Sequence, residues 1–327
     1  MPPSSAPSEA PSRWYAAFRG RRVFITGGTG FLGNHLVRRL VALGADVTVA
    51  ARAPINRSRI RDLARRIRLV EADVRKRRPL ERAVRLSRPE FIFHLAAYGV
   101  DPRKRNPTTI IQTNVQGMVH LLEAADPFPY RRLVNTGTCF EYGQQKNRMS
   151  EQSALDPVNV YAASKTTAGQ LCDLSRRQEG KPIVTLRPFT FFGPGERPDR
   201  LIPSVILSIL QRRPIHISSG TQTRDYTYVE DMADAFLRAA LAPSAVGEVI
   251  NVGTGRDFAV REIAERIRRI MGSRVPLKIG AVQTRRDEVW RICCDNGKAK
   301  RLLGWKPRFT FEEAVHKTIR WFQKNGI

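Results

Sequence analysis

The pair Tyr161 and Lys165 is the first feature of this sequence that could do chemistry. The apolar pattern predicts one long helix from Val158 to Arg177, and residues four apart share a helix face. A tyrosine with a pKa of about 10 is a poor base at neutral pH, but a neighbouring ammonium stabilises the tyrosinate and moves that pKa toward the working range. Thr138 follows a predicted strand and can hydrogen-bond the same substrate oxygen, and Asn114 in an earlier helix can support a proton relay. The catalytic candidates are therefore Thr138, Tyr161, Lys165 and Asn114.

A glycine-rich turn supplies a second signal. It follows a short apolar strand, Val23 to Thr26, and leads into a helix predicted from Phe31 to Leu43. Glycines at this spacing allow a tight turn and close approach of the backbone to a pyrophosphate, and the helix N-terminus directs free N–H groups at the phosphates. Because strand, turn and helix follow in the order of a βαβ unit, we interpret the turn as a dinucleotide site formed by Gly27, Gly30, Phe31, Leu32 and Gly33.

The end of the second predicted strand, Val47 to Ala50, indicates which dinucleotide is bound. NAD sites usually carry an acidic residue here for the ribose hydroxyls, but this chain has none and places Arg52 beside the position. An arginine can pair with a 2′-phosphate, so the sequence favours NADP, with NAD as the alternative. The remaining cofactor contacts are expected from Asp73 and Val74 at the adenine, from Leu95, Ala96 and Ala97 after the fourth strand, and from Tyr161 and Lys165.

Short apolar strands alternate with helical stretches as far as Arg187, after which prolines interrupt the rhythm. Such alternation indicates βαβ units and a parallel sheet. We expect an α/β protein with a Rossmann-type doubly wound parallel sheet and a smaller C-terminal substrate-binding lobe. The expected parts are a disordered tail over 1–20, a cofactor-binding domain over 21–187 with a return strand near 227–252, and a substrate lobe over 188–226 and 253–327.

The composition is that of a globular protein, with 42% hydrophobic and 26% charged residues in 327. No apolar run is long enough to span a membrane, the first residues lack the pattern of a signal peptide, and the four cysteines lack zinc-site spacing. We therefore expect a cytoplasmic protein with reduced thiols, no membrane partner and no metal.

The net charge of +26 raises the question of a nucleic-acid partner. Between Arg57 and Arg88 there are thirteen basic residues against four acidic ones, interleaved with aliphatic rather than aromatic side chains. This pattern is typical of the solvated face of ordinary secondary structure, since stacking on bases needs aromatic side chains. Nucleic-acid binding is thus not expected, although a non-catalytic cofactor-binding protein with a basic RNA-binding surface stays as an alternative.

Taken in order, these motifs resemble those of the extended short-chain dehydrogenase/reductases, in the branch of nucleotide-sugar epimerases and dehydratases. The matching segments run from Arg22 to Phe322 and include the glycine turn, Asp73-Val74, His94-Leu95-Ala96-Ala97, Asn114-Val115, Thr138 and Tyr161-Ala162-Ala163-Ser164-Lys165.

The resemblance implies hydride transfer between the C4 of a nucleotide-diphosphate sugar and the nicotinamide, with Tyr161 moving the hydroxyl proton. It implies substrate contacts from Thr138, Thr190, Arg224 and Arg285, where the two arginines meet the diphosphate. It also implies a homodimer packed through the helices at Thr109–Ala125 and Val158–Arg177.

The chain departs from this branch just after Thr138. Dehydratases carry acidic residues there, but this chain has Cys139 and Phe140, and Glu141 one place further on is expected to point elsewhere. A 4,6-dehydratase is therefore disfavoured. Two activities stay open: a 4-ketoreductase that consumes NADPH, favoured by Arg52, and a 4-epimerase that retains NAD, favoured by the likeness of residues 189–199 to uronic-acid 4-epimerases. We lean slightly to the reductase.

Overall fold

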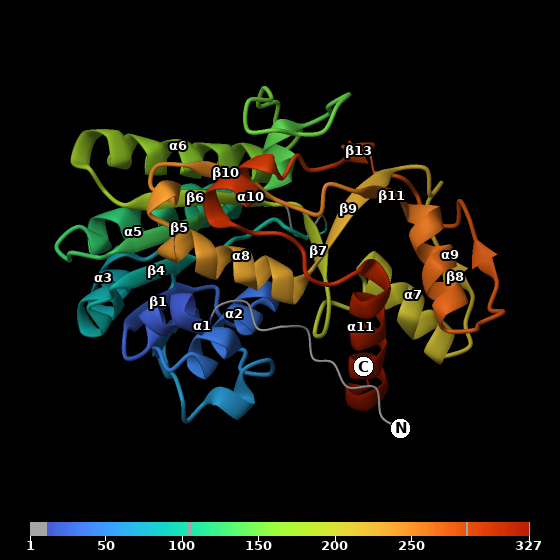
Figure 1. The fold of residues 1–327 in the computed structure, drawn as a ribbon, viewed down its shortest axis with the longest axis horizontal. Helices are drawn as coiled ribbons and strands as arrows, with labels where there is room; N and C mark the ends of the chain where they lie inside the picture. Colours follow the sequence, from blue (N-terminus) through green and yellow to red (C-terminus); the bar gives the residue numbers. More distant parts are fainter. Residues whose placement is uncertain (1–11, 102, 104–105, 286, 327) are drawn as a thin grey trace.

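A seven-stranded parallel sheet organises the computed structural model, which describes residues 12–101, 103, 106–285 and 287–326 (Figure 1). The strand order is β10-β6-β5-β4-β1-β2-β3, so the order reverses between β1 and β4. In open α/β sheets the ligand crevice lies outside the carboxyl ends of the strands at such a switch point. The strands are β1 Arg22–Thr26, β2 Asp46–Ala51, β3 Arg68–Glu71, β4 Phe91–His94, β5 Arg132–Thr136, β6 Ile183–Pro188 and β10 Val249–Val252. The predicted Rossmann-type fold is confirmed.

Helices cover both faces of this sheet. The helices α2 Phe31–Ala42 and α8 Val229–Leu241 pack against each other and contribute to one large apolar core. The opposite face carries α3 Arg77–Ser87, α5 Gly117–Ala125 and α6 Val160–Glu179 around a second core. Strands buried on both faces read as continuous apolar runs, as β4 does with all four of its residues buried.

Two local features of the sequence determine where α6 begins and ends. The side chain of Asn159 accepts a hydrogen bond from the backbone N–H of Ala162 at 2.9 Å, which caps the helix start. Gly180 ends the helix in the left-handed conformation at φ 67°, where glycine carries no steric cost. The position of Tyr161 in the first turn of α6 follows from this cap.

A smaller region beside the main sheet is built largely from the second half of the chain (right in Figure 1). Its four-stranded sheet centres on β9 Thr223–Tyr228, which pairs with β7 Thr190–Phe192, β11 Asp257–Ala259 and β13 Arg291–Ile292. The smaller region also contains α7 Leu201–Leu210, β8 Ile215–His216, α9 Val260–Ile270, β12 Leu277–Lys278 and α11 Phe311–Asn325. Two further helices belong to the main-sheet part: α4 Pro107–Ile111 packs on α6, and α10 Gly297–Leu303 packs on β10 and α8. The assignment of the smaller region to substrate binding stays a prediction.

The expected disordered tail is wrong for its last part. A short helix α1, Ser12–Tyr15, and a 3-10 turn at Ala16–Phe18 precede β1. Phe18 is fully buried with its ring 4.9 Å from that of Phe91, and the hydroxyl of Tyr15 donates a 2.5 Å hydrogen bond to Asp234 on α8. The apolar area that these two aromatic side chains bury outweighs the effect of the Pro- and Ser-rich composition around them, so this segment is ordered. The expected tail residues 1–11 lie outside the described part of the chain.

The helix predicted from Thr109 to Ala125 is interrupted. A π-helical turn at Gln112–Gln116 separates α4 from α5. Single π turns often occur at functional sites, and this one carries Asn114.

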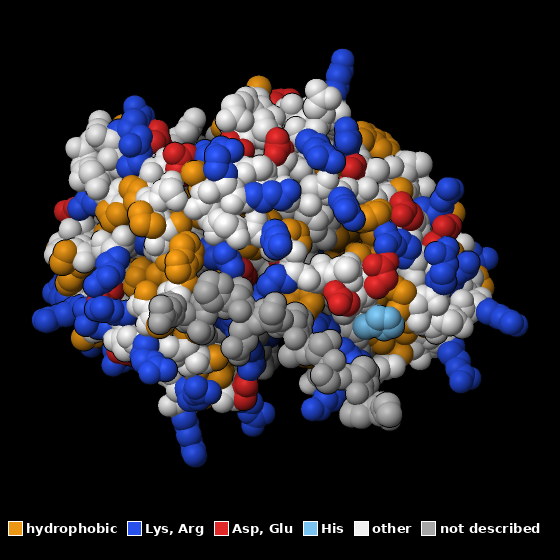
Figure 2. All heavy atoms as spheres, in the orientation of Figure 1, with side chains coloured by type: hydrophobic (Ala, Val, Ile, Leu, Met, Phe, Trp, Pro, Cys, Tyr) orange, Lys and Arg blue, Asp and Glu red, His pale blue; other side chains and the backbone are white. Residues whose placement is uncertain are grey.

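Basic side chains are spread over the face shown in Figure 2 rather than gathered at one place, with acidic side chains between them. This distribution agrees with the interpretation of the arginine-rich segment as solvated surface. Among the described residues, none of the helices combines the length and apolarity that crossing a membrane requires.

Candidate active site

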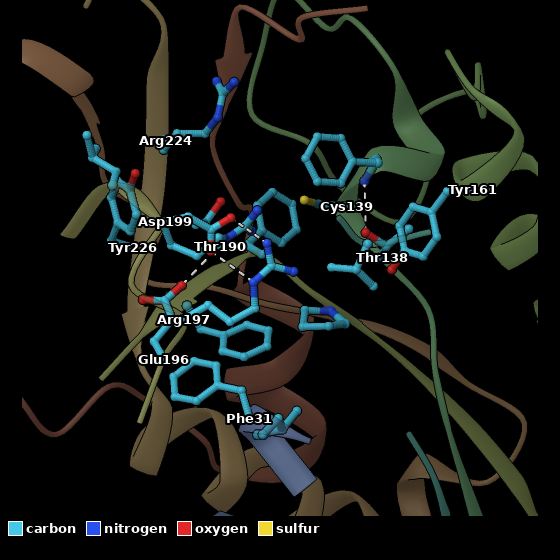
Figure 3. A pocket seen from close by; sticks show the side chains of 18 of the residues that line it. Phe31, Thr138, Cys139, Tyr161, Thr190, Glu196, Arg197, Asp199, Arg224 and Tyr226 are labelled. Atoms are coloured by element: carbon cyan, nitrogen blue, oxygen red, sulfur yellow. Dashed lines mark hydrogen bonds and ion pairs between the residues drawn. The ribbon is translucent and has the colours of Figure 1, made fainter. Parts of the chain in front are cut away.

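One pocket of about 540 Å³ joins the glycine turn to the Tyr161–Lys165 pair and to the smaller region (Figure 3). It lies at the carboxyl ends of β1, β4 and β5, where a doubly wound sheet places its ligands. Many of the residues proposed from sequence line it: Gly27, Gly30, Phe31, Leu32, Gly33, Leu95, Ala97, Thr138, Tyr161, Lys165, Thr190, Arg224 and Arg285. The fold thus brings the cofactor, catalytic and substrate candidates to one cavity.

Tyr161 and Thr138 meet at the centre of this pocket. The side chains of Thr138 and Tyr161 lie side by side in the pocket (Figure 3), so both hydroxyls can reach one substrate oxygen. Burial raises the pKa of Tyr161 well above its ordinary value, and the neighbouring Thr138 side chain opposes that rise only in part. The direction is opposite to the one expected from sequence, because loss of solvent outweighs the charges around the phenol. Tyr161 is therefore a neutral phenol that can donate a proton.

Lys165 lies one turn further along α6 and is also buried. Burial lowers the pKa of this ammonium to about 8, and the nearby carboxylate of Glu141 opposes the decrease. The charge of Lys165 also acts on His94, whose pKa is lowered to about 3 by burial and by this charge, so the imidazole is neutral. Lys165 is thus a cation at neutral pH whose charge depends on one buried carboxylate.

Asn114 holds the elements around the pair in place. Its side-chain amide donates to the carbonyl of Tyr98 at 3.0 Å and to the hydroxyl of Ser164 at 2.8 Å, and its oxygen accepts from the N–H of Tyr98 at 2.9 Å. These bonds connect the π-helical turn to α6 and to the segment after β4. The predicted part of Asn114 in a proton relay stays a prediction.

The glycine turn has the shape that a pyrophosphate requires. A Cβ on Gly33 would lie 2.2 Å from the carbonyl oxygen of Gly27, and a Cβ on Gly27 would lie 2.6 Å from the backbone nitrogen of Ala96. The N-terminus of α2 has no side-chain cap, so its first N–H groups point toward the pocket without an intrahelical partner. The residues present therefore fit the diphosphate of a dinucleotide.

The same end of α2 is bound to the strand that leads into the smaller region. The rings of Phe31 and Phe191 stack with centroids 5.5 Å apart. The Nε2 of His35 lies 2.8 Å from the carbonyl oxygen of Pro194, and Arg59 Nε donates to the carbonyl of Gly195 at 3.1 Å. We call these three contacts the hinge contacts below.

The other cofactor candidates lie outside the residues that line the pocket. Arg52 is exposed just beyond β2. The Asp73 carboxylate accepts a 2.6 Å bond from Arg75, and the pKa of Asp73 is lowered chiefly by Arg75 against the effect of burial. Val74 packs in the second core, and the backbone N–H of Ala96 donates to Thr26 Oγ1 at 3.3 Å. Contact of these four residues with an adenosine moiety stays a prediction.

Two of the substrate candidates, Thr190 and Arg224, stand across the pocket from Tyr161 (Figure 3). Thr190 lies on β7, and Arg224 lies on the paired strand β9, where its guanidinium forms an ion pair with Glu288. Glu288 also lines the pocket, as does Arg285. Arginines that line a cavity, as Arg224 and Arg285 do, suit the binding of a diphosphate.

The positions after Thr138 turn in different directions. Cys139 and Phe140 line the pocket, whereas Glu141 does not, as expected from sequence. Burial raises the pKa of the Cys139 thiol to about 12, so this group is neutral. Neither of the two described positions directly after Thr138 thus presents a carboxylate to the pocket.

Sequence reasoning missed one acidic group in the pocket. Glu196 is 9% exposed, and burial raises its pKa to about 8 although Arg200 lies 3.7 Å away. Its neighbours Arg197 and Asp199 also line the cavity and are paired with each other. The only available signal was the density of charged residues directly after Gly193-Pro194, since nothing local shows that this loop folds back over Thr190.

Comparison with known proteins agrees with this site. The chain is 29% identical over 93% of its length to a probable dTDP-glucose 4,6-dehydratase of Sinorhizobium fredii, with 93% of that protein covered. It is 34% identical to a UDP-glucuronate 4-epimerase of Thermodesulfobacterium geofontis, over 72% of each chain. The structure of a UDP-glucose 4-epimerase of Thermus thermophilus in complex with NAD matches with a TM-score of 0.85 at 26% identity, covering 94% of this chain and all of that one. Residues 23–253 match the profile of the NAD dependent epimerase/dehydratase family, and the chain is an enzyme of this family, of the extended short-chain dehydrogenase/reductase type.

Proposed function

We propose that this enzyme reduces the 4-keto group of a nucleotide-diphosphate sugar with NADPH. The observation that carries the proposal is the single pocket in which the glycine turn, the Thr138–Tyr161 pair and the arginines at positions 224 and 285 all meet. A cavity of this composition accommodates a dinucleotide at one end and a diphosphate at the other, with a proton donor between them.

The protonation state of the site supports reduction. Tyr161 is a neutral phenol and Lys165 a buried cation, which is the state that gives a proton to a carbonyl oxygen. When bound, the nicotinamide supplies the hydride. Thr138 orients the keto oxygen, Tyr161 donates the proton that completes the hydroxyl, and Lys165 stabilises the resulting tyrosinate until a proton returns from solvent.

The cofactor preference rests on Arg52. The side chains near the end of β2 include no acid that could hold a ribose 2′-hydroxyl, and Arg52 is exposed where a 2′-phosphate could reach it. The Thermus thermophilus structure contains NAD, which makes NAD the alternative cofactor here.

Dehydration is less well supported, although dehydratases are among the relatives. Elimination of water needs an acid and a base beside the reacting carbons. The pocket offers the neutral thiol of Cys139 and the ring of Phe140 after Thr138, and Glu141 faces away from the cavity.

A 4-epimerase is the second candidate. The segment from Thr190 to Asp199 brings Arg197 and Arg200 into the pocket, and such cations suit a sugar that carries a carboxylate. The relative from Thermodesulfobacterium geofontis is a UDP-glucuronate 4-epimerase. An epimerase would return the hydride to the other face of the sugar and retain its NAD.

Assembly as a homodimer accompanies this proposal. The helices α4 and α6 pack together and expose apolar side chains, with Ile111 45%, Val160 40% and Leu174 39% exposed. Apolar side chains on adjacent exposed helices suit a contact with a second copy. Light scattering at micromolar concentration would give twice the mass of 37.0 kDa, and a monomer would contradict the dimer.

One experiment separates the two activities. Mass spectrometry of the nucleotide released from denatured protein is combined with titration of the native protein with NADPH and NADH. An empty site that prefers NADPH supports the reductase, which consumes its cofactor. Stoichiometric NAD refutes the reductase and supports the epimerase.

A further inference from the structure

The carboxylate of Glu141 is buried directly behind the catalytic turn, with no exposed surface. Its Oε1 accepts a 2.7 Å hydrogen bond from the backbone N–H of Thr138, and its Oε2 accepts a 2.8 Å bond from Nε of Arg187 on β6. The Thr138 side chain in turn accepts from the backbone N–H of Phe140, so the turn closes as a capping box. Glu141 therefore fixes the backbone that carries the Thr138 hydroxyl.

Arg187 connects the turn at Thr138 to the strands β6 and β10. Its Nη1 donates to the hydroxyl of Tyr142 at 2.8 Å, and its guanidinium lies over the Tyr142 ring at 4.8 Å. The same hydroxyl donates to Asn251 Oδ1 on β10 at 2.7 Å. A buried ion pair whose remaining bonds are satisfied holds one geometry, because every alternative leaves a charge or a donor without a partner.

The ion pair leaves no room for a side chain at position 137. A Cβ on Gly137 would lie 2.6 Å from Oε1 of Glu141 and 3.0 Å from Cγ of Arg187. A glycine at this position is thus required for the carboxylate to reach the Thr138 N–H.

The charge of Glu141 also acts on the catalytic pair. It opposes the burial that lowers the pKa of Lys165, and it adds to the burial that raises the pKa of Tyr161. Burial raises the pKa of Glu141 itself, while Arg187 and the Thr138 N–H oppose that rise. Besides one another, the titratable groups that act on Glu141, Tyr161 and Lys165 are Arg187, Cys139, Arg200 and Cys172, and the charge of Lys165 in turn acts on His94.

We propose that Glu141 is a positioning residue, which holds Thr138 against Tyr161 and supplies the buried negative charge that faces Lys165. The inference rests on the proposed function, in which these three side chains handle the proton. It assigns Glu141 to a supporting task instead of to the elimination of water.

The test uses Glu141→Gln, which keeps the size of the side chain and an oxygen for the Thr138 N–H but removes the charge. Tyrosinate absorbance is followed against pH in the wild type and in Tyr161→Phe, and again in Glu141→Gln and in the double variant. The difference between the wild type and Tyr161→Phe, and likewise between Glu141→Gln and the double variant, gives the titration of Tyr161 alone, without any substrate. We expect Tyr161 to titrate about one pH unit lower in Glu141→Gln, since a neighbouring anion is lost. An unchanged titration overturns the proposal.

Glu151→Gln is the matched control, because Glu151 accepts a 2.7 Å bond from the N–H of Asn251 at the far end of the same network. In this control Tyr161 should titrate at the same pH as in the wild type. A shift as large as that in Glu141→Gln contradicts the role of Glu141. If Glu141→Gln does not fold, Glu141→Asp decides by the same titration. That variant keeps the charge, so Tyr161 should titrate near the wild-type pH, and a downward shift overturns the proposal.

Turnover provides the second readout. With a nucleotide-diphosphate 4-keto sugar and NADPH, the alkaline limb of the kcat profile should move to lower pH in Glu141→Gln, with a loss of about tenfold above it and little change in KM. An unmoved limb refutes the electrostatic role. Failure of the proposed function is distinguishable, because the wild type itself would then show no turnover while the tyrosinate titration still reports on Glu141.

Discussion

The buried carboxyl of Glu196 should make the enzyme lose stability as pH rises. Burial raises the pKa of Glu196 to about 8 in the folded chain, above its ordinary value of 4.5. At pH values below 4.5, Glu196 is protonated in both the folded and the unfolded chain. Above this pH only the unfolded chain releases the proton, so the free energy of unfolding falls by about 1.4 kcal/mol per pH unit until the folded group also ionises. From about pH 6 to about pH 8 this amounts to roughly 3 kcal/mol.

The variant Glu196→Gln removes this ionisation and keeps the size of the side chain. Urea denaturation is measured at several pH values, and the free energy of unfolding of the wild type is subtracted from that of the variant. The difference should grow in favour of Glu196→Gln as pH rises and level off above about pH 8. The control Glu265→Gln replaces a carboxyl that is 44% exposed, and it should run parallel to the wild type. A difference for Glu196→Gln that stays constant over this range refutes the reasoning.

Three further results are expected. Tyr161→Phe should lower kcat by about 10²- to 10⁴-fold, because it removes the proton donor, and leave NADPH affinity by fluorescence titration nearly unchanged; normal turnover would remove Tyr161 from its role. Arg52→Ala should weaken NADPH about 10- to 100-fold and NADH hardly at all, and equal effects would contradict the NADP assignment. Phe18→Ala should destabilise the protein by about 3–5 kcal/mol in denaturation, whereas Trp14→Ala, at a position 42% exposed, should cost much less; equal small effects would show that this segment does not support the core.

The sequence predicted most of the cofactor side of the fold because its signals are local. The glycine turn lies between an apolar strand and a periodic helix, and each of those elements is recognisable by itself. The spacing of Tyr161 and Lys165 likewise needs only a helix, and Asn159 begins that helix where the pair requires it. Residues whose positions depend only on such local elements could therefore be assigned to one site from the sequence.

The substrate side depended on contacts that no local pattern records. Prolines interrupt the pattern of the sequence after Arg187, yet one of them, Pro203, lies in the first turn of the helix α7, where its missing N–H has no partner to lose. Phe18 was assigned to a tail because its partner Phe91 lies more than seventy residues away. The direction of the Tyr161 pKa also depends on burial, which only the folded chain defines.

For the two ligands of the proposed function, the hinge contacts predict a thermodynamic linkage. Phe31, His35 and Arg59 belong to the part that borders the glycine turn, and they contact residues 191–195, which lead directly to Glu196 and Arg197. A dinucleotide that orders the α2 N-terminus should therefore also order residues 191–195, next to the proposed sugar site. Linkage is reciprocal, so the factor by which one ligand tightens the other is the same in both directions. Loss of the Phe31–Phe191 stack would then reduce cooperativity between the ligands more than it reduces the affinity for either ligand alone.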